Sequence, residues 1–203
     1  MRVMSKFCPP LKNRARWLLQ ELVMRRHLAI LLVLGCAAPV AANPPGVRVY
    51  QSSADSNVTE GETIIPGEAA DIYQTVLDYK RWTEIFPDVA KVEITQQNGV
   101  DARVTLIGPD GHRDNLHFHN QPTARMVWFE DTGNGGHAEV WAEIMFVPGS
   151  DPNTTRVHTR LYADVKGVAS LVISDGSVRR QREQKITKDL VHIRGYFQRT
   201  ASR

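Results

Sequence analysis

The sequence predicts an α+β fold in which a curved antiparallel sheet wraps around a long C-terminal helix, preceded by a cleavable leader. Three observations support it. Residues 1–42 are first basic and then apolar, residues 89–166 are short strand-like segments separated by turn residues, and residues 177–198 have helical periodicity. Removing the leader from the 203 residues leaves 161, enough for one compact domain with a hydrophobic core.

The leader has the layout of a secretory signal peptide. Arg25 and Arg26 precede an apolar run from Leu28 to Leu34, and small residues continue to Ala42. This apolar stretch is shorter than the roughly 20 residues of a membrane-spanning helix. Translation from Met24 would give the usual signal-peptide length, so Met24 is an alternative start. We predict a periplasmic or secreted protein.

Two processing sites are compatible with the leader. Val40-Ala41-Ala42 is a small-residue cleavage site before Asn43, and this is the prediction. Val33-Leu34-Gly35-Cys36 resembles a lipoprotein box, which makes an anchored lipoprotein through Cys36 the alternative. The two cysteines, Cys8 and Cys36, both lie in the leader. The mature chain therefore offers neither a disulfide nor a cysteine metal site.

The positive charge of the whole chain comes from its leader. Of the 25 Lys and Arg residues, seven precede Asn43, together with only one of the 22 acidic residues, which leaves the mature chain with 18 basic and 21 acidic residues and a formal net charge of −3. A nucleic-acid partner is therefore not expected. From Arg179 onward, however, eight basic residues accompany two acidic ones, so the C-terminal segment is a basic element on an acidic body.

The mature chain begins with short strands and two helices. Alternation of apolar and polar residues predicts the first strand. Pro66-Gly67 ends a second extended segment, and Pro87 ends the second helix. The predicted elements are a linker at Asn43–Gly46, strands at Val47–Ser52 and ending at Thr63–Ile65, and helices at Glu68–Tyr79 and Arg81–Phe86.

Six further strands are predicted between residues 89 and 166. Turns such as Gln97-Asn98-Gly99 and Gly108-Pro109-Asp110-Gly111 separate them, and connections this short predict an antiparallel meander. Gly133-Asn134-Gly135-Gly136 opens no helix, so it is interpreted as a turn and not a phosphate loop. The predicted strands are Val89–Thr95, Ala102–Ile107, Leu116–His119, Arg125–Phe129, Glu139–Val147 and Arg156–Val165.

The last predicted element is a helix over about residues 177–198. Its apolar residues are separated by four, three and four positions, a spacing that predicts one apolar stripe facing a core: Ile186, Leu190, Ile193 and Phe197. Its Lys and Arg residues, Lys188 among them, are interpreted as a solvated face.

Residues 69–89, AADIYQTVLDYKRWTEIFPDV, resemble the first-helix segment of the START-like (SRPBCC) superfamily, which includes polyketide cyclases, coenzyme-Q-binding START proteins and pollen allergens. The order of elements from Thr63 to Phe197 also resembles the helix-grip fold of that superfamily. The resemblance implies a START-like domain over residues 63–203, preceded by a linker and first-strand region at 43–62. It implies fold more strongly than function, because the superfamily includes binders, transporters and enzymes on one scaffold.

His117 and His119 share one face of a predicted strand and could bind a metal with Glu139, Glu143 and His158. The favoured interpretation places all five on the face opposite Phe118, with the glutamates in cross-strand charge pairs with Arg156, Arg160 and His158. We therefore predict no metal site, no catalytic residue and no cofactor.

The predicted function is binding of a hydrophobic small molecule such as a lipid, quinone or polyketide-like compound, without catalysis; the ligand class is implied by the resemblance. The alternatives are a cyclase or dehydratase, with Tyr162 or His117 as acid or base if the strand faces were reversed, and an envelope protein whose basic helix contacts anionic lipid. The expected ligand-binding residues are Trp82, Phe86, Phe118, Trp128, Ala142, Phe146, Leu161, Ile186, Leu190 and Ile193.

Overall fold

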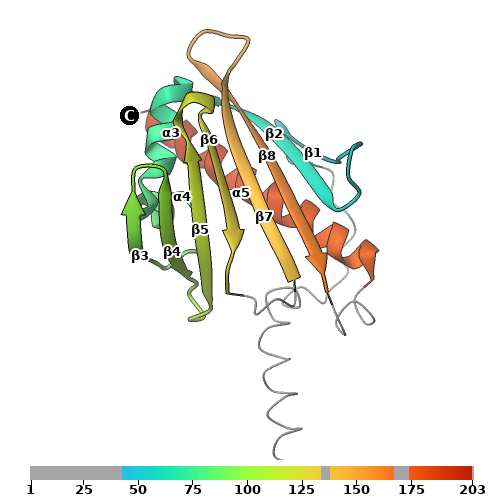
Figure 1. Ribbon diagram of the computed structural model, residues 1–203. Helices are drawn as coiled ribbons and strands as arrows, with labels where there is room; N and C mark the ends of the chain where they lie inside the picture. The colour runs from blue at the N-terminus through green and yellow to red at the C-terminus, as the bar shows by residue number, and fades with distance from the viewer. Residues whose placement is uncertain (1–42, 134–137, 167–173, 203) are drawn as a thin grey trace, which may run out of the picture. The chain divides into compact units, whose positions relative to one another are not determined.

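The computed structural model describes residues 43–133, 138–166 and 174–202, all within one compact unit (Figure 1). The predicted leader and most of the 133–136 turn lie outside the described residues. The strands are β1 (Val47–Gln51), β2 (Val58–Pro66), β3 (Lys91–Asn98), β4 (Asp101–Ile107), β5 (Arg113–Gln121), β6 (Met126–Asp131), β7 (Ala138–Pro148) and β8 (Thr154–Val165). The helices are α3 (Ala69–Leu77), α4 (Trp82–Ile85) and α5 (Asp175–Ala201), with 3-10 turns η1 (Tyr79–Arg81) and η2 (Pro122–Ala124).

The eight strands form one antiparallel sheet in the order β1-β2-β8-β7-β6-β5-β4-β3. The predicted meander is confirmed, because β3 to β8 are neighbours in sequence order. Its last strand pairs with β2, in a register that joins Val58 to Tyr162 and Pro66 to Thr154. The α5 helix lies across one face of this sheet (Figure 1), so the predicted α+β helix-grip architecture is confirmed. No helix in the described part of the chain is long and apolar enough to cross a membrane.

The β2 strand is longer than the sequence predicted. Its residues facing α5 include Thr59, Gly61 and Thr63, which are small and show no apolar alternation, although all three are buried. The β6 strand starts one residue later than predicted, because Arg125 adopts a left-handed conformation with φ 48° at the end of η2.

The two predicted helices between β2 and β3 are present. Gly67, at φ 113°, turns the chain out of β2 into α3, a conformation that glycine adopts without a steric penalty. The indole N–H of Trp82 donates to the carbonyl oxygen of Val76 at 2.8 Å and fixes α4 against α3. The α4 helix ends at Ile85, and the next residue, Phe86, is extended before Pro87, as expected for the residue that precedes a proline.

The α5 helix approaches β2 at Gly61. A Cβ atom at Gly61 would lie 2.9 Å from Cδ1 of Leu190 and closer still to Cγ2 of Ile186. The helix begins at Ser174, whose hydroxyl accepts from the N–H of Ser177. The predicted stripe is confirmed, since Ile186, Leu190, Ile193 and Phe197 are all buried.

One basic residue of α5, Arg182, corrects the prediction of a solvated basic face. Arg182 is 4% exposed, and its guanidinium donates to Thr59 Oγ1, the Ala163 carbonyl and the Ser56 carbonyl. Lys188 is exposed but its ammonium bonds Asp88, at the end of α4, at 3.1 Å. Polar residues on either side of the buried stripe of a helix can reach neighbouring strands and helices. Only the residues opposite the stripe face solvent without such contacts.

We expect Gly61→Ala to destabilise the fold by about 1–3 kcal/mol, because the added methyl group overpacks the contact with Ile186 and Leu190. The control is Gly176→Ala, in the first turn of α5, where a Cβ meets nothing within 4 Å. The control should be neutral or stabilising by up to about 1 kcal/mol, since alanine favours helix. Denaturant unfolding of both variants measures the contrast, and equal stabilities would show that α5 does not depend on Gly61.

Candidate functional site

The alternation of β5 defines two faces of the sheet. Leu116, Phe118 and Asn120 are buried on the inner side, towards the helices, while His117 and His119 lie between them on the outer side. Phe118 is 0% exposed. The face assignment made from the sequence is therefore confirmed, and a function for His117 in the interior is excluded by its position.

Aromatic side chains gather on the inner side, where β4 to β6 meet α4. The Trp82 ring lies 5.3 Å from the Phe118 ring and 5.1 Å from that of Phe86. Phe118 also contacts Tyr79 and Phe129, at ring distances of 4.7 and 5.0 Å. Edge-to-face and tilted pairs of this kind stabilise one another beyond the area that they bury.

Nine of the ten residues predicted to bind ligand reach this inner side or the helix stripe that covers it. Their contact with a ligand stays a prediction. They belong to the core or pack against it, and Ala142 is buried beside them: Trp82, Phe86, Phe118, Ala142, Phe146, Leu161, Ile186, Leu190 and Ile193.

Trp128 is the exception: the sequence leaves its direction open, and the structure places it outside the interior in which a ligand-binding residue was expected. It pairs with His119 across β5 and β6, and the two rings lie 5.0 Å apart on the outer side. The preceding residue, Val127, is 0% exposed and takes the inward position. Four consecutive apolar residues hid this alternation in the sequence, and the register of the neighbouring strand decides it.

A first group of polar side chains, Tyr79, Asn120 and Tyr73, lies within the apolar interior. The Tyr79 hydroxyl and the Asn120 side chain bond each other at 3.1–3.2 Å, and burial raises the pKa of Tyr79 to about 12 despite this bond. The Tyr73 hydroxyl is buried without a hydrogen-bond partner among the described residues. A buried hydroxyl without a partner is costly, so a water molecule or a ligand atom is expected there.

A second polar group lies at the other end of β5 and β6. Asp114 and Asp131 are in phase with the inward residues of their strands, and His112 Nε2 lies 2.9 Å from Asp114. Burial raises the pKa of the Asp131 carboxyl above its ordinary value, and the charge of Asp114 adds to the rise. The N–H of Gly133, which donates to Asp131 at 2.7 Å, opposes it. The carboxyl is thus held in a setting that favours its protonated form.

Lys185 and His192, on one flank of α5, lie near the same end of the interior as Asp114. Burial acts to lower the pKa of the Lys185 ammonium, but the carboxylates of Asp189, Asp88 and Asp114 outweigh it and the pKa is raised. Its side chain is 55% exposed, so these carboxylates decide the direction. Burial lowers the pKa of His192 despite Asp88 nearby. Charged groups of α5 and of the strands thus interact across the end of the apolar interior.

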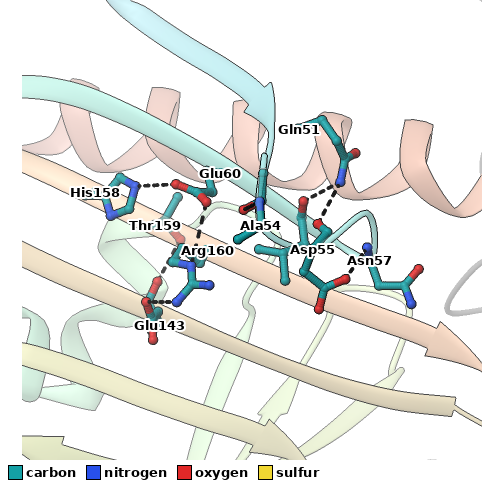
Figure 2. Close-up of polar contacts among 11 residues, drawn as sticks. Gln51, Ala54, Asp55, Asn57, Glu60, Glu143, His158, Thr159 and Arg160 are labelled. Carbon is teal, nitrogen blue, oxygen red and sulfur yellow. Dashed lines mark hydrogen bonds and ion pairs between the residues drawn. The ribbon is translucent and has the colours of Figure 1, made fainter.

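The outer side of the sheet carries a network of ion pairs (Figure 2). Arg160 lies between Glu143, at 3.0 Å, and Glu60, at 3.9 Å, and Glu60 also bonds His158 at 3.1 Å. Hydrogen bonds from Ser52 and then His158 lower the pKa of Glu60 although burial opposes them. The predicted pair of Glu143 with Arg160 is confirmed.

The five residues considered as a metal set and rejected in the sequence, His117, His119, Glu139, Glu143 and His158, are not brought together. Glu139 pairs with Lys166, and the other two take part in the Arg160 network. Tyr162, the alternative acid, also lies on the outer side, where its ring stacks on Trp141 at 5.3 Å and an interplanar angle of 3°.

No family model and no curated protein matches the chain. Solved structures do match. The STAR-related lipid transfer protein of Xanthomonas axonopodis has a TM-score of 0.59 at 16% identity, over 78% of this chain and 97% of that one. The Zhui aromatase/cyclase of Streptomyces sp. R1128 has 0.58 at 14%, over 76% and 96%. The di-domain ARO/CYC BexL has 0.57 at 15%, and the chain covers 45% of its length.

The chain has the START-like fold. At these identities the likeness establishes the fold alone, and it confirms at that level the resemblance carried by residues 69–89. The START-like sheet and its helix place Asp131, Asp114 and Lys185 at one end of the interior. Sequence reasoning missed these three, although a signal existed. Asp131 stands two positions from Phe129, and Asp114 two from Leu116, so both carboxylates continue an inward alternation.

We expect Asp131→Asn to stabilise the protein at pH 7, by up to about 2 kcal/mol, the usual range of a polar substitution. A carboxyl whose pKa is raised by folding destabilises the native state where it is ionised, above its folded pKa, and this penalty is absent below the unfolded value near 3.8. The stability gain should therefore shrink as the pH falls towards 4.

Denaturant unfolding at several pH values between 4 and 7 measures this gain. The control is Glu84→Gln, an exposed carboxyl of α4, which should change stability by less than about 0.5 kcal/mol at every pH. An Asp131→Asn variant that is less stable than the parent at pH 7 would show that the ionised carboxylate stabilises the fold.

Proposed function

We propose that the chain is an exported START-like protein that binds an apolar small molecule between the inner side of the sheet and α5. The observation that carries the proposal is an aromatic interior with polar groups at both ends. Along β5 the inward residues are Asp114, Leu116, Phe118 and Asn120, and a site of this kind is what an elongated molecule with polar ends requires. The names of the Xanthomonas lipid transfer protein and the Zhui aromatase/cyclase support the same ligand class.

Each end of the site offers a different interaction. The Tyr73 hydroxyl, which has no partner among the described residues, would bond a hydroxyl or carbonyl group of the ligand. At the opposite end, the carboxyl of Asp131, whose pKa is raised by burial, would bond a polar group of the ligand. The apolar body would contact Phe118 and Phe129, where burial of carbon atoms supplies the affinity.

Export is part of the proposal and rests on the leader in the sequence. The order of basic, apolar and small residues up to Ala42 supports it. N-terminal sequencing of the mature protein is expected to find Asn43, and a lipid-modified Cys36 would favour the anchored alternative.

We expect Leu190→Ala to lower both stability and ligand retention. Leu190 is 0% exposed within the interior, so removing its methyl groups costs about 2–5 kcal/mol and alters the shape of the site. The matched control is Val191→Ala, since the neighbouring side chain is 38% exposed and should change stability by less than about 1 kcal/mol.

Native mass spectrometry of gently purified protein measures ligand retention for both variants. The parent and Val191→Ala should carry an extractable apolar compound, and Leu190→Ala should lose it or carry others. If the parent purifies empty and binds no apolar fluorescent probe, the binding proposal is wrong.

A second candidate function is catalysis of the aromatase/cyclase type, favoured by the raised pKa of Asp131 at the end of an apolar interior. In this case the Asp131 carboxyl would exchange a proton with the substrate as a general acid or base, which a carboxamide cannot do. Asp131→Asn would then retain ligand but lose turnover of a poly-β-ketone substrate, followed by chromatography. Equal turnover by both proteins, or none by either, leaves binding as the function.

Contact of the basic helix with anionic lipid receives less support. Arg179 and Lys185 pair with Glu183 and Asp189, Lys188 pairs with Asp88, and Arg182 is buried. Charges that are already paired contribute little to attraction by a membrane surface. Sedimentation of the protein with anionic vesicles would revive this hypothesis.

A further inference from the structure

Three side chains on the outer side of the sheet could hold a metal ion. Asp101 of β4 and His117 and His119 of β5 each offer one ligand atom, and these atoms all lie within 4.8 Å of one another. The set is distinct from the interior, because Ala102 and Phe118, which alternate with these residues, are both buried at 0% exposure on the opposite side. It also departs from the sequence-based prediction of no metal site, and it contains Asp101 in place of the glutamates and His158 that were considered there.

The sheet fixes the backbone of all three residues. Asp101 and His119 are register partners between β4 and β5, and His119 Nδ1 lies 2.6 Å from Asp101 Oδ1. The imidazole rings of His117 and His119 have centroids only 4.1 Å apart. The β5 strand pairs with β4 on one side and β6 on the other. Folding therefore already holds the three residues close together, and metal binding need not order their backbone.

The spacing of the ligand atoms is close to what a tetrahedral ion needs. Metal bonds of about 2.0–2.2 Å to nitrogen and oxygen place two ligand atoms roughly 3.3 Å apart. Atoms within 4.8 Å must approach by no more than about 1.5 Å, which side-chain rotation provides, and the ion would replace the proton shared by His119 and Asp101. All three side chains are partly exposed, so water can complete the coordination.

Neighbouring groups orient the ligands. Glu130 Oε1 of β6 lies 3.5 Å from His117 Nδ1, and carboxylates of this kind commonly fix the tautomer and ring direction of a metal-bound histidine. The Trp128 ring packs on His119 at 5.0 Å and limits its rotation. Arg103, the register partner of His117, brings a positive charge, but its side chain is exposed and free to turn towards solvent.

We propose that Asp101, His117 and His119 bind a divalent first-row transition-metal ion. Two imidazoles and one carboxylate suit ions such as Cu²⁺ and Zn²⁺, and they disfavour Mg²⁺ and Ca²⁺, which prefer all-oxygen sites. The site is independent of the proposed ligand function, since its residues and those of the interior lie on opposite faces of the sheet.

The test is titration of the full chain with Cu²⁺, followed by tryptophan fluorescence. Trp128 is in contact with a proposed ligand, so binding should quench its emission in a saturable, one-to-one manner. His117→Gln and His119→Gln should each weaken binding at least tenfold, since even the loss of an orienting group beyond the ligands costs 10- to 100-fold. Trp128→Phe should bind the ion but lose the quenched component.

The control is His158→Gln, a partly exposed histidine of the same face that pairs with Glu60 and lies outside the set. It should leave both affinity and quenching unchanged. Far-UV circular dichroism confirms that the variants fold. Quenching that survives in His117→Gln and His119→Gln, or that is equal in Trp128→Phe and the parent, would overturn the proposal.

Discussion

The contact of α5 with β2 at Gly61 is the constraint on which the rest of the fold depends. With only a hydrogen atom at this position, Ile186 and Leu190 can lie directly against the strand. Thr59 and Thr63, on either side in the inward row, keep the surface shallow along the same strand. The α5 helix is therefore held on β2 and β8, while α3 packs against β7 and β8 and the aromatic side chains of η1 and α4 cover β5 and β6.

Arg182 strengthens this contact by a different means. Within the described part of the chain, its buried guanidinium donates to neutral acceptors, a threonine hydroxyl and two backbone carbonyls, and burial lowers its pKa. Such a group costs desolvation energy without the return of an ion pair. It nevertheless satisfies carbonyls of Ala163 and Ser56 that lie beside the helix, and its planar fork fits one position of α5 along the sheet. Apolar packing supplies the attraction, and the arginine selects the register.

The fold could be predicted from the sequence because its signals are local. The periodicity of Ile186, Leu190 and Ile193, the stops at Pro66 and Pro87, and the turns of the meander all depend on near neighbours. What could not be predicted depends on distant segments. The length of β2 follows from its pairing with β8, and the direction of Trp128 follows from the register with His119. Asp101 joins the histidines only through the pairing of β4 with β5.

The same difference between local signals and contacts of distant segments applies to the candidate sites. The burial of the apolar residues could be predicted, because they recur at regular intervals along helices and strands, whereas their contact with a ligand stays a prediction. Asp114 and Asp131 were not identified, since a charged residue at the end of a strand suggests a turn more readily than an interior. Burial raises the pKa of Asp131, so its ionised form costs stability, and groups of this kind are frequent at functional sites.

The β5 strand connects these observations, because its two faces carry different chemistry. The inward row of Leu116, Phe118 and Asn120 belongs to the interior, and the outward pair of His117 and His119 belongs to the surface. Successive side chains of a strand point to opposite faces, so a change in one row need not disturb the other. The proposed ligand binding inside and the proposed metal binding outside are therefore expected to be separable by mutation. A shift of the β5 register by one residue, however, would move the histidines inward and Phe118 outward, and would abolish both together.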